Sequence, residues 1–199
     1  MINKIKNIII IDESGRESTI QAEFIGKGQF ARCYRVGDSV YSFVNNGNRH
    51  SDYSKEAVSM WADSNNVHIP QIEKMGNYDN KHGYGILYKM PYYESLSVKH
   101  AEARSQFKKL KKAFDKNLWN VSNELGFEKN QRLIQYLRDN SPELESIIDA
   151  LESIDGAGRN YGDNYIIEIG KRNIKVDSEG RLILLDVLFN ADALKERRG

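Results

Sequence analysis

Cysteine is nearly absent from the chain, and its scarcity excludes two common ways of stabilising a small fold. The single cysteine, Cys33, cannot form an internal disulfide or a cysteine-based zinc site. No apolar stretch approaches the roughly 20 residues that span a bilayer. The apolar run 8–11 is also too short for a signal-peptide core, and two acidic residues follow it directly. We therefore expect a soluble protein of the cytoplasm.

An excess of charge of one sign is missing as well. The 29 Lys and Arg residues are balanced by 28 Asp and Glu residues, which gives a formal net charge of +1. Because a strong field of one sign is what draws nucleic acid or an anionic membrane to a protein, we expect neither as a partner. Hydrophobic residues make up 40% of the 199-residue chain, enough to bury a core in one domain or in two small lobes.

Residue patterns place strands in the first part of the chain and again near its end. Strands are predicted over residues 8–11, 19–25, 31–36, 40–44, 69–75, 84–88, 165–169, 174–176 and 182–185. Helices are predicted over residues 51–65, 107–118, 133–137 and 141–154. Ser141 is the expected N-cap of the last helix, with Pro142 in its first turn. Strands and helices that are segregated in this way predict an α+β fold.

Two features far apart in the sequence carry the candidate chemistry. Gly26 and Gly28 lie between predicted strands, where glycines allow backbone amides to approach a phosphate, although a plain glycine-rich turn is the alternative. Asp186 ends the apolar strand 182–185, where a carboxylate is costly unless it is paired or binds a metal. The hairpin that leads to this strand begins at Asn173, so both side chains are predicted at one end of a ribbon. An amide oxygen and a carboxylate suit Mg²⁺ with phosphates, and a capping or salt-bridging Asp186 is the alternative.

In order and spacing, these segments resemble the protein-kinase-like enzymes. Residues 173–186, NIKVDSEGRLILLD, resemble the segment from the catalytic-loop asparagine to the metal-binding aspartate. Residues 24–34, FIGKGQFARCY, resemble the glycine-rich loop with its second strand, and residues 84–93 resemble the fifth strand running into the hinge. A narrower resemblance is to the small kinase-like proteins of bacteriophages. The resemblance implies a bilobal fold, with a strand-rich N-lobe over 1–90 and a shortened helical C-lobe over 91–199.

The same resemblance implies ATP and Mg²⁺ as cofactors and assigns roles at the metal and at the transferred phosphate. Asn173 and Asp186 would hold the metal, and Glu168, five residues before the asparagine, would be the catalytic base. Lys171 would contact the γ-phosphate, with a solvent-exposed turn lysine as the alternative.

Further residues are implied to bind the rest of the nucleotide. Gly26, Lys27 and Gly28 would cover the phosphates, and Glu56 stands where kinases carry the glutamate of their first helix. Adenine is usually held by backbone groups of the hinge. Because Pro91 has no N–H, the hinge donor is expected to be Met90 or Tyr92.

Departures from the kinase pattern leave catalysis open. Ser42 stands where the strand lysine is expected, and Glu168 stands where an aspartate is expected. A displacement of order 1 Å can cost on the order of 10²-fold in rate. Only thirteen residues follow Asp186, so no full activation segment is expected.

Three functions follow from these features. The first is a weak, atypical kinase that phosphorylates protein, itself included. The second is a pseudokinase that binds a protein partner. If the chain is viral, we expect this partner to be a host protein and the chain to be located in the host cytoplasm. The third, a small-molecule phosphotransferase, is disfavoured by the short C-lobe.

Overall fold

The structure is a computed structural model, and it describes residues 5–11, 16–28, 31–45, 53–80, 83–118 and 125–192. The chain divides into two compact units. The first contains residues 1–52 and 71–92, and the second contains residues 53–70 and 93–199. Within the described residues they contain a six-stranded sheet, a three-stranded sheet, a two-stranded sheet and four α-helices, which agrees with the predicted α+β class.

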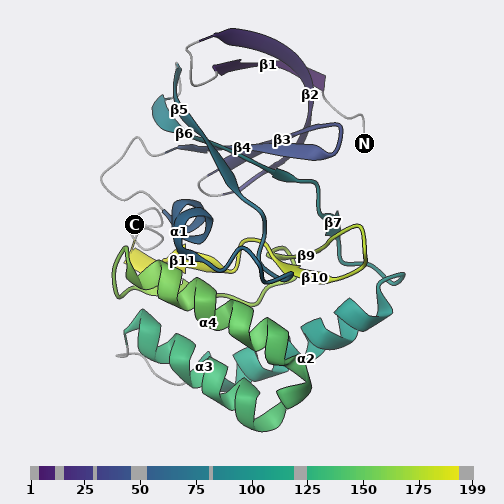
Figure 1. The fold of residues 1–199 in the computed structure, drawn as a ribbon, viewed down its shortest axis with the longest axis vertical. Coiled ribbons are helices and arrows are strands. Elements are labelled where there is room, and N and C mark those ends of the chain that lie inside the picture. The colour runs from purple at the N-terminus through teal and green to yellow at the C-terminus, as the bar shows by residue number, and fades with distance from the viewer. Residues whose placement is uncertain are drawn as a thin grey trace. The chain divides into compact units, whose positions relative to one another are not determined.

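The first unit is a six-stranded antiparallel sheet with the strand order β1-β2-β3-β4-β6-β5 (Figure 1). Its strands are β1 (Ile5–Ile11), β2 (Glu17–Lys27), β3 (Ala31–Val36), β4 (Ser39–Asn45), β5 (Glu73–Asn80) and β6 (Gly83–Pro91). The strand predicted over 69–75 is therefore misplaced. Ile69 belongs to a turn of the second unit, and its N–H donates to the Asn66 carbonyl at 3.1 Å. The strand is instead formed by the more polar residues of β5, which have a weak intrinsic preference for strand structure. Pairing with β6 stabilises the strand there.

Successive side chains of a strand point to opposite faces of the sheet, and both faces of the first sheet carry buried residues. One face holds a cluster of Ile8, Ala22, Tyr34 and Leu87, against which partly buried aromatic side chains pack. The Tyr34 ring meets the rings of Phe24 and Phe43 edge to face, at centroid distances of 5.6 and 5.5 Å. On β4 the other face carries Val40, Ser42 and Val44, all buried.

The four α-helices of the described residues all lie in the second unit. They are α1 (Ser54–Trp61), α2 (Ala101–Leu118), α3 (Gly126–Asn140) and α4 (Glu145–Arg159), with the 3₁₀-helix η1 (Pro142–Leu144) before α4. Figure 1 shows α3 and α4 side by side, and α4 also packs against α1. The predicted apolar stripe of α4 is buried, including Ile147, Leu151 and Ile154. Ser141 is the N-cap of η1 rather than of α4, and its side chain makes no cap hydrogen bond, which corrects that expectation.

Two small antiparallel sheets complete the second unit. In one, β8 (Tyr165–Ile167) pairs with β11 (Leu188–Asn190). In the other, β9 (Ile174–Val176) lies between β10 (Leu182–Leu184) and β7 (Glu94–Ser95). The strands β7 and β11 were not predicted. Among the described residues, none of the helices combines the length and apolarity needed to cross a membrane.

The segment 53–70 lies in the second unit, although it precedes residue 90, where the sequence divides the two expected lobes. Helix α1 packs against α4 and β11. At its start, the Tyr53 N–H donates to the Tyr165 hydroxyl at 3.3 Å. After the helix, Asn66 Nδ2 donates to the Ser146 carbonyl at 2.8 Å. These contacts join segments far apart in the chain, so chain order alone does not reveal them.

Candidate functional site

The ribbon of β9 and β10 brings together the two predicted metal ligands. Asn173 directly precedes β9, and Asp186 lies two residues beyond the end of β10. The strands pair from Ile174 opposite Leu184 to Val176 opposite Leu182. The Asp186 N–H then donates to the Asn173 carbonyl at 3.2 Å. The prediction that the hairpin places Asn173 and Asp186 at one end of the ribbon is confirmed.

Glu168 joins this pair from the neighbouring sheet. It follows β8 directly, and its N–H donates to the Val187 carbonyl at 2.7 Å. Asn173 Nδ2 donates to Glu168 Oε2 at 3.3 Å, which leaves the Asn173 amide oxygen for another partner. A Cβ added at Gly170 would lie 3.6 Å from Asn173 Nδ2 and 4.0 Å from Glu168 Oε1. The glycine therefore leaves space beside both side chains.

Lys55 contributes a cation that the sequence did not indicate. It lies in the first turn of α1, and its Nζ forms an ion pair with Asp186 Oδ1. The lysine side chain is 13% exposed and the aspartate 54%, so the pair is open to solvent on its carboxylate side. Glu56, the residue to which the resemblance assigns a role, is next in the helix and half-buried. Lys55 has no motif around it, and only the packing of α1 beside β11 brings it near Asp186.

A buried polar network holds β8 in place under Glu168. The Asn130 amide, 1% exposed, donates to the Tyr165 carbonyl at 2.9 Å and accepts from the Ile167 N–H at 2.8 Å. It also donates to Asp155 Oδ1 at 2.6 Å. The other Asp155 oxygen accepts from Arg159, with its Nη2 at 2.7 Å. The Asn130 side chain thus makes the backbone hydrogen bonds to β8 that a neighbouring strand would otherwise make, and β8 leads directly into Glu168.

His68 fixes the other ribbon in a similar way. The Nδ1–H of the buried His68 ring donates to the Leu182 carbonyl oxygen at 2.7 Å, because a carbonyl oxygen can only accept a hydrogen bond. The His68 carbonyl in turn accepts from the Leu184 N–H at 2.9 Å. Since Leu184 is two residues before Asp186, this loop sets where the carboxylate emerges. No motif around His68 indicates this role.

The donor atoms at this site are of the type that a magnesium ion prefers. Among the described residues, no group of three or more His, Cys, Asp or Glu side chains is arranged to hold a metal. Asn173 and Asp186 offer an amide oxygen and a carboxylate. Mg²⁺ is commonly bound through one or two such oxygens, with water and phosphate completing the shell. Lys55 already compensates the charge of Asp186, so a metal here shares or displaces that contact.

The glycine segment of the first unit is open rather than strained. Gly26 lies in β2, at an irregularity of its pairing with β3, and the Gly28 N–H donates to the Ala31 carbonyl at 2.8 Å. Neither glycine has a positive φ. A Cβ at Gly26 would meet no atom within 4 Å, and one at Gly28 would meet only the Ala31 oxygen, at 3.9 Å. Lys27 between them is exposed.

Ser42, at the expected lysine position, is fully buried. It lies on β4 opposite Cys33 of β3, and Cys33 Sγ donates to its Oγ at 3.6 Å. Because the serine hydroxyl is neutral, it cannot supply the positive charge of a lysine ammonium at this position.

At the expected hinge, the strand pairing decides where the backbone donors point. The Tyr92 N–H donates to the Asp38 carbonyl at 2.8 Å, and this bond continues the β4–β6 register, in which Val40 faces Met90. In an antiparallel ladder, bonded and non-bonded pairs alternate. The Met90 N–H is therefore directed toward Val40, and the residue whose nitrogen faces away from β4 is Pro91, which has no hydrogen to donate.

No known family model matches this chain, and no characterised protein matches it. The assignment of a function therefore depends on the geometry. That geometry gathers Glu168, Asn173 and Asp186 in one place, with Lys55 added. Lys171 is exposed in the turn after Gly170, within three residues of both Glu168 and Asn173.

Proposed function

We propose that this chain is an atypical kinase-like protein of bilobal fold that binds ATP with Mg²⁺ and phosphorylates protein hydroxyl groups weakly. The observation that carries the proposal is the meeting of Glu168, Asn173 and Asp186 in the second unit. These residues come from two different sheets and span nineteen positions of sequence, counted inclusively from 168 to 186. A carboxylate base beside a magnesium-type donor pair is the equipment that phosphoryl transfer requires.

Each of the three side chains has a definable task in such a reaction. When bound, ATP with Mg²⁺ would supply the phosphoryl group and neutralise its charge. Asn173 and Asp186 would hold the metal through their side-chain oxygens. Glu168 would accept the proton of the attacking hydroxyl on Oε1, since Oε2 accepts the hydrogen bond from Asn173. In the first unit, the open backbone at Gly26 and Gly28, with Lys27, would cover the phosphates.

A pseudokinase, which keeps the fold as a protein-binding module, is the second candidate. Ser42 is fully buried where a kinase needs a phosphate-binding lysine. The ladder also directs the Met90 and Tyr92 N–H groups toward β4, which removes the usual backbone donor for adenine. Lys55 already balances the charge of Asp186. Each of these features weakens nucleotide binding without disturbing the fold.

Nucleotide binding separates the candidates first. The melting temperature of the purified chain is measured with Mg²⁺ alone, ATP alone and both together, because a ligand that binds the folded state raises it. The kinase proposal requires a rise with Mg²⁺ and ATP together that Asp186→Asn removes. Asp115→Asn, a change of the same kind on exposed α2, serves as the matched control.

Phosphoryl transfer is then measured with radiolabelled ATP, with the chain alone and with added protein substrates. Asp186→Asn should remove Mg²⁺-dependent label, and Ser42→Lys should increase it by restoring the missing charge. Because Ser42 is buried, Ser42→Met is the control that adds similar length without charge. Absence of label in the starting protein, with no gain from Ser42→Lys in folded protein, leaves the pseudokinase.

A further inference from the structure

The two edges of the six-stranded sheet differ in how they are protected. β5 forms one edge, and its pairing with β6 is interrupted by a bulge between Lys74 and Gly76, where Gly76 has φ +141°. Its first two residues, Glu73 and Lys74, are charged and exposed. Bulges and charged side chains are the devices by which edge strands avoid pairing with other chains.

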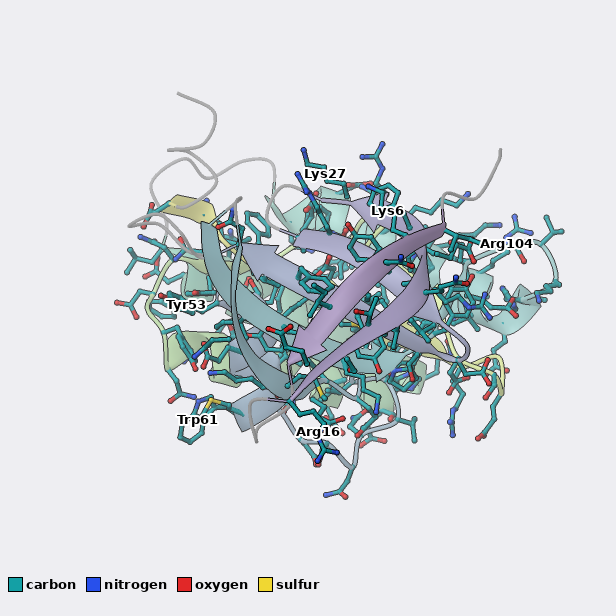
Figure 2. All side chains as sticks on the ribbon, turned by 90° about the horizontal axis from the view of Figure 1, so that it is seen from above. Lys6, Arg16, Lys27, Tyr53, Trp61 and Arg104 are labelled. Carbon is teal, nitrogen blue, oxygen red and sulfur yellow. The ribbon has the colours of Figure 1, made fainter. Side chains whose placement is uncertain are left out.

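The other edge, β1, lacks those devices. Its seven residues pair with β2 in an unbroken register, from Ile5 opposite Glu23 to Ile11 opposite Glu17. No described strand pairs with its outer side. The strand contains no proline, and its one charged residue, Lys6, does not guard the edge, because its ammonium lies 5.6 Å from the centre of the Phe24 ring on β2. Figure 2 looks onto this strand, with Lys6 labelled near its N-terminal end.

Apolar side chains line the outward face of the same strand. Ile5 is 68% exposed and Ile9 57% exposed, and the exposed Asn7 lies between them on that face. A regular edge strand that carries exposed isoleucines is a site where another strand can add to the sheet.

We propose that β1 pairs antiparallel with β1 of a second copy of this chain, about a two-fold axis that passes between the two Asn7 residues. In this register each Ile5 faces Ile9 of the second copy, and the two Asn7 amides face each other. Directly opposed residues of an antiparallel pair are close on the same face, so apolar meets apolar and amide meets amide. On the other face, Lys6 lies opposite Ile8 rather than opposite the second lysine.

The strand pattern favours a second copy over an unrelated partner because it is complementary to itself. A two-fold axis between two sheets requires an interface that matches its own image, and the order Ile-x-Asn-x-Ile reads the same in both directions. A register centred one residue later would set Asn7 against Ile9. Since a short strand pair buries less than the roughly 1,200 Å² of a stable interface, we expect reversible, concentration-dependent dimers. This inference does not rest on the proposed function.

Sedimentation velocity of the full chain over a wide concentration range tests association. We expect a monomer–dimer equilibrium that Ile9→Lys weakens by at least about tenfold, because a buried ammonium replaces the apolar contact. Val98→Lys makes the same change at an 80% exposed site of the second unit and should leave the equilibrium unchanged. Thermal unfolding verifies that both variants are folded. A monomer at every concentration overturns the proposal, as does a dimer that Ile9→Lys does not weaken.

Cross-linking tests the register. In a Cys33→Ser background, Asn7→Cys should form a disulfide-linked dimer under mild oxidation, because the two residues are directly opposed. Lys6→Cys should not, because it faces Ile8 of the second copy. A dimer that cross-links through residue 6 and not through residue 7 contradicts the proposed pairing.

Discussion

The Lys55 ammonium of α1 forms an ion pair with the Asp186 carboxylate that follows β10. The two residues are 131 positions apart, and their contact ties the first helix of the second unit to the predicted metal site. Lys55 supplies at Asp186 the positive charge that a metal ion would otherwise supply. Metal binding and the ion pair therefore depend on the same carboxylate.

Lys55→Met should tighten the binding of Mn²⁺, used as a spectroscopic probe for Mg²⁺, in the absence of nucleotide. Removing a competing cation at contact distance is worth about 1 kcal/mol at a partly exposed site, or roughly fivefold in affinity. Electron paramagnetic resonance of free Mn²⁺ measures this. Asp186→Asn should abolish the binding, and Lys112→Met, on the exposed side of α2, should not change it. Weaker binding in Lys55→Met would show that the lysine supports the site instead of competing for it.

The sequence predicted the part of the site that depends on local geometry. Asn173 and Asp186 are joined by one hairpin, so their meeting follows from two apolar strands and a turn between them. Glu168 is close because only four residues separate it from Asn173. Lys55 could not be predicted in the same way, since its contact depends on how α1 packs against β11.

The fold shows the same division between local and tertiary causes. The strong apolar stripe of α4 and the alternating strand β4 were recognised, because their periods are long enough to read. The strand β5 was misplaced, since its residues form a strand only through pairing with β6. Asn130 was missed because a polar residue within a helix pattern gives no sign that it is buried and bonded to β8.

Asn130→Ala should destabilise the second unit by about 2–4 kcal/mol. It removes the acceptor for the buried Ile167 N–H and one donor to the buried Asp155 carboxylate. Urea unfolding followed by circular dichroism measures the loss. Asn117→Ala is the control, since the half-buried Asn117 amide donates within its own helix, to the Ala113 carbonyl. Equal free energies of unfolding for the two variants would contradict a structural role of the network.

Two glycines of the second unit should respond oppositely to alanine. A Cβ at Gly126 would lie 2.8 Å from the Tyr165 oxygen and 2.9 Å from the Asp163 oxygen, both backbone atoms that cannot move aside easily. Gly126→Ala should therefore cost about 1–3 kcal/mol. Gly156, in α4, has nothing within 4 Å of the added carbon, so Gly156→Ala should gain up to about 1 kcal/mol from helix propensity. Denaturation midpoints of the two variants should shift in opposite directions, and a shift of the same sign would contradict this packing at the start of α3.

Asp177 should make the β9–β10 turn sensitive to acid. Burial alone would raise the pKa of the Asp177 carboxyl, but hydrogen bonds from the Arg181 guanidinium and from the N–H groups of Arg181 and Glu179 outweigh it and lower the pKa. Because the folded pKa lies below the unfolded value, the carboxylate stabilises the fold above about pH 4, and this stabilisation is lost as the pH falls through the folded pKa. Asp177→Asn should thus cost about 1–2 kcal/mol at neutral pH, where charged hydrogen bonds are lost.

The decisive measurement for Asp177 is the difference in free energy of unfolding between the starting protein and Asp177→Asn across a pH series. That difference should be constant at neutral pH and should shrink only below about pH 4, where the wild-type carboxyl takes up its proton. Asp38→Asn is the control, because its carboxylate is fully exposed and 3.9 Å from Arg35, and such a surface pair contributes little. A difference between the starting protein and Asp177→Asn that persists unchanged into acid would mean that the shape of the side chain, and not its charge, holds the turn between β9 and β10, the two strands flanked by Asn173 and Asp186.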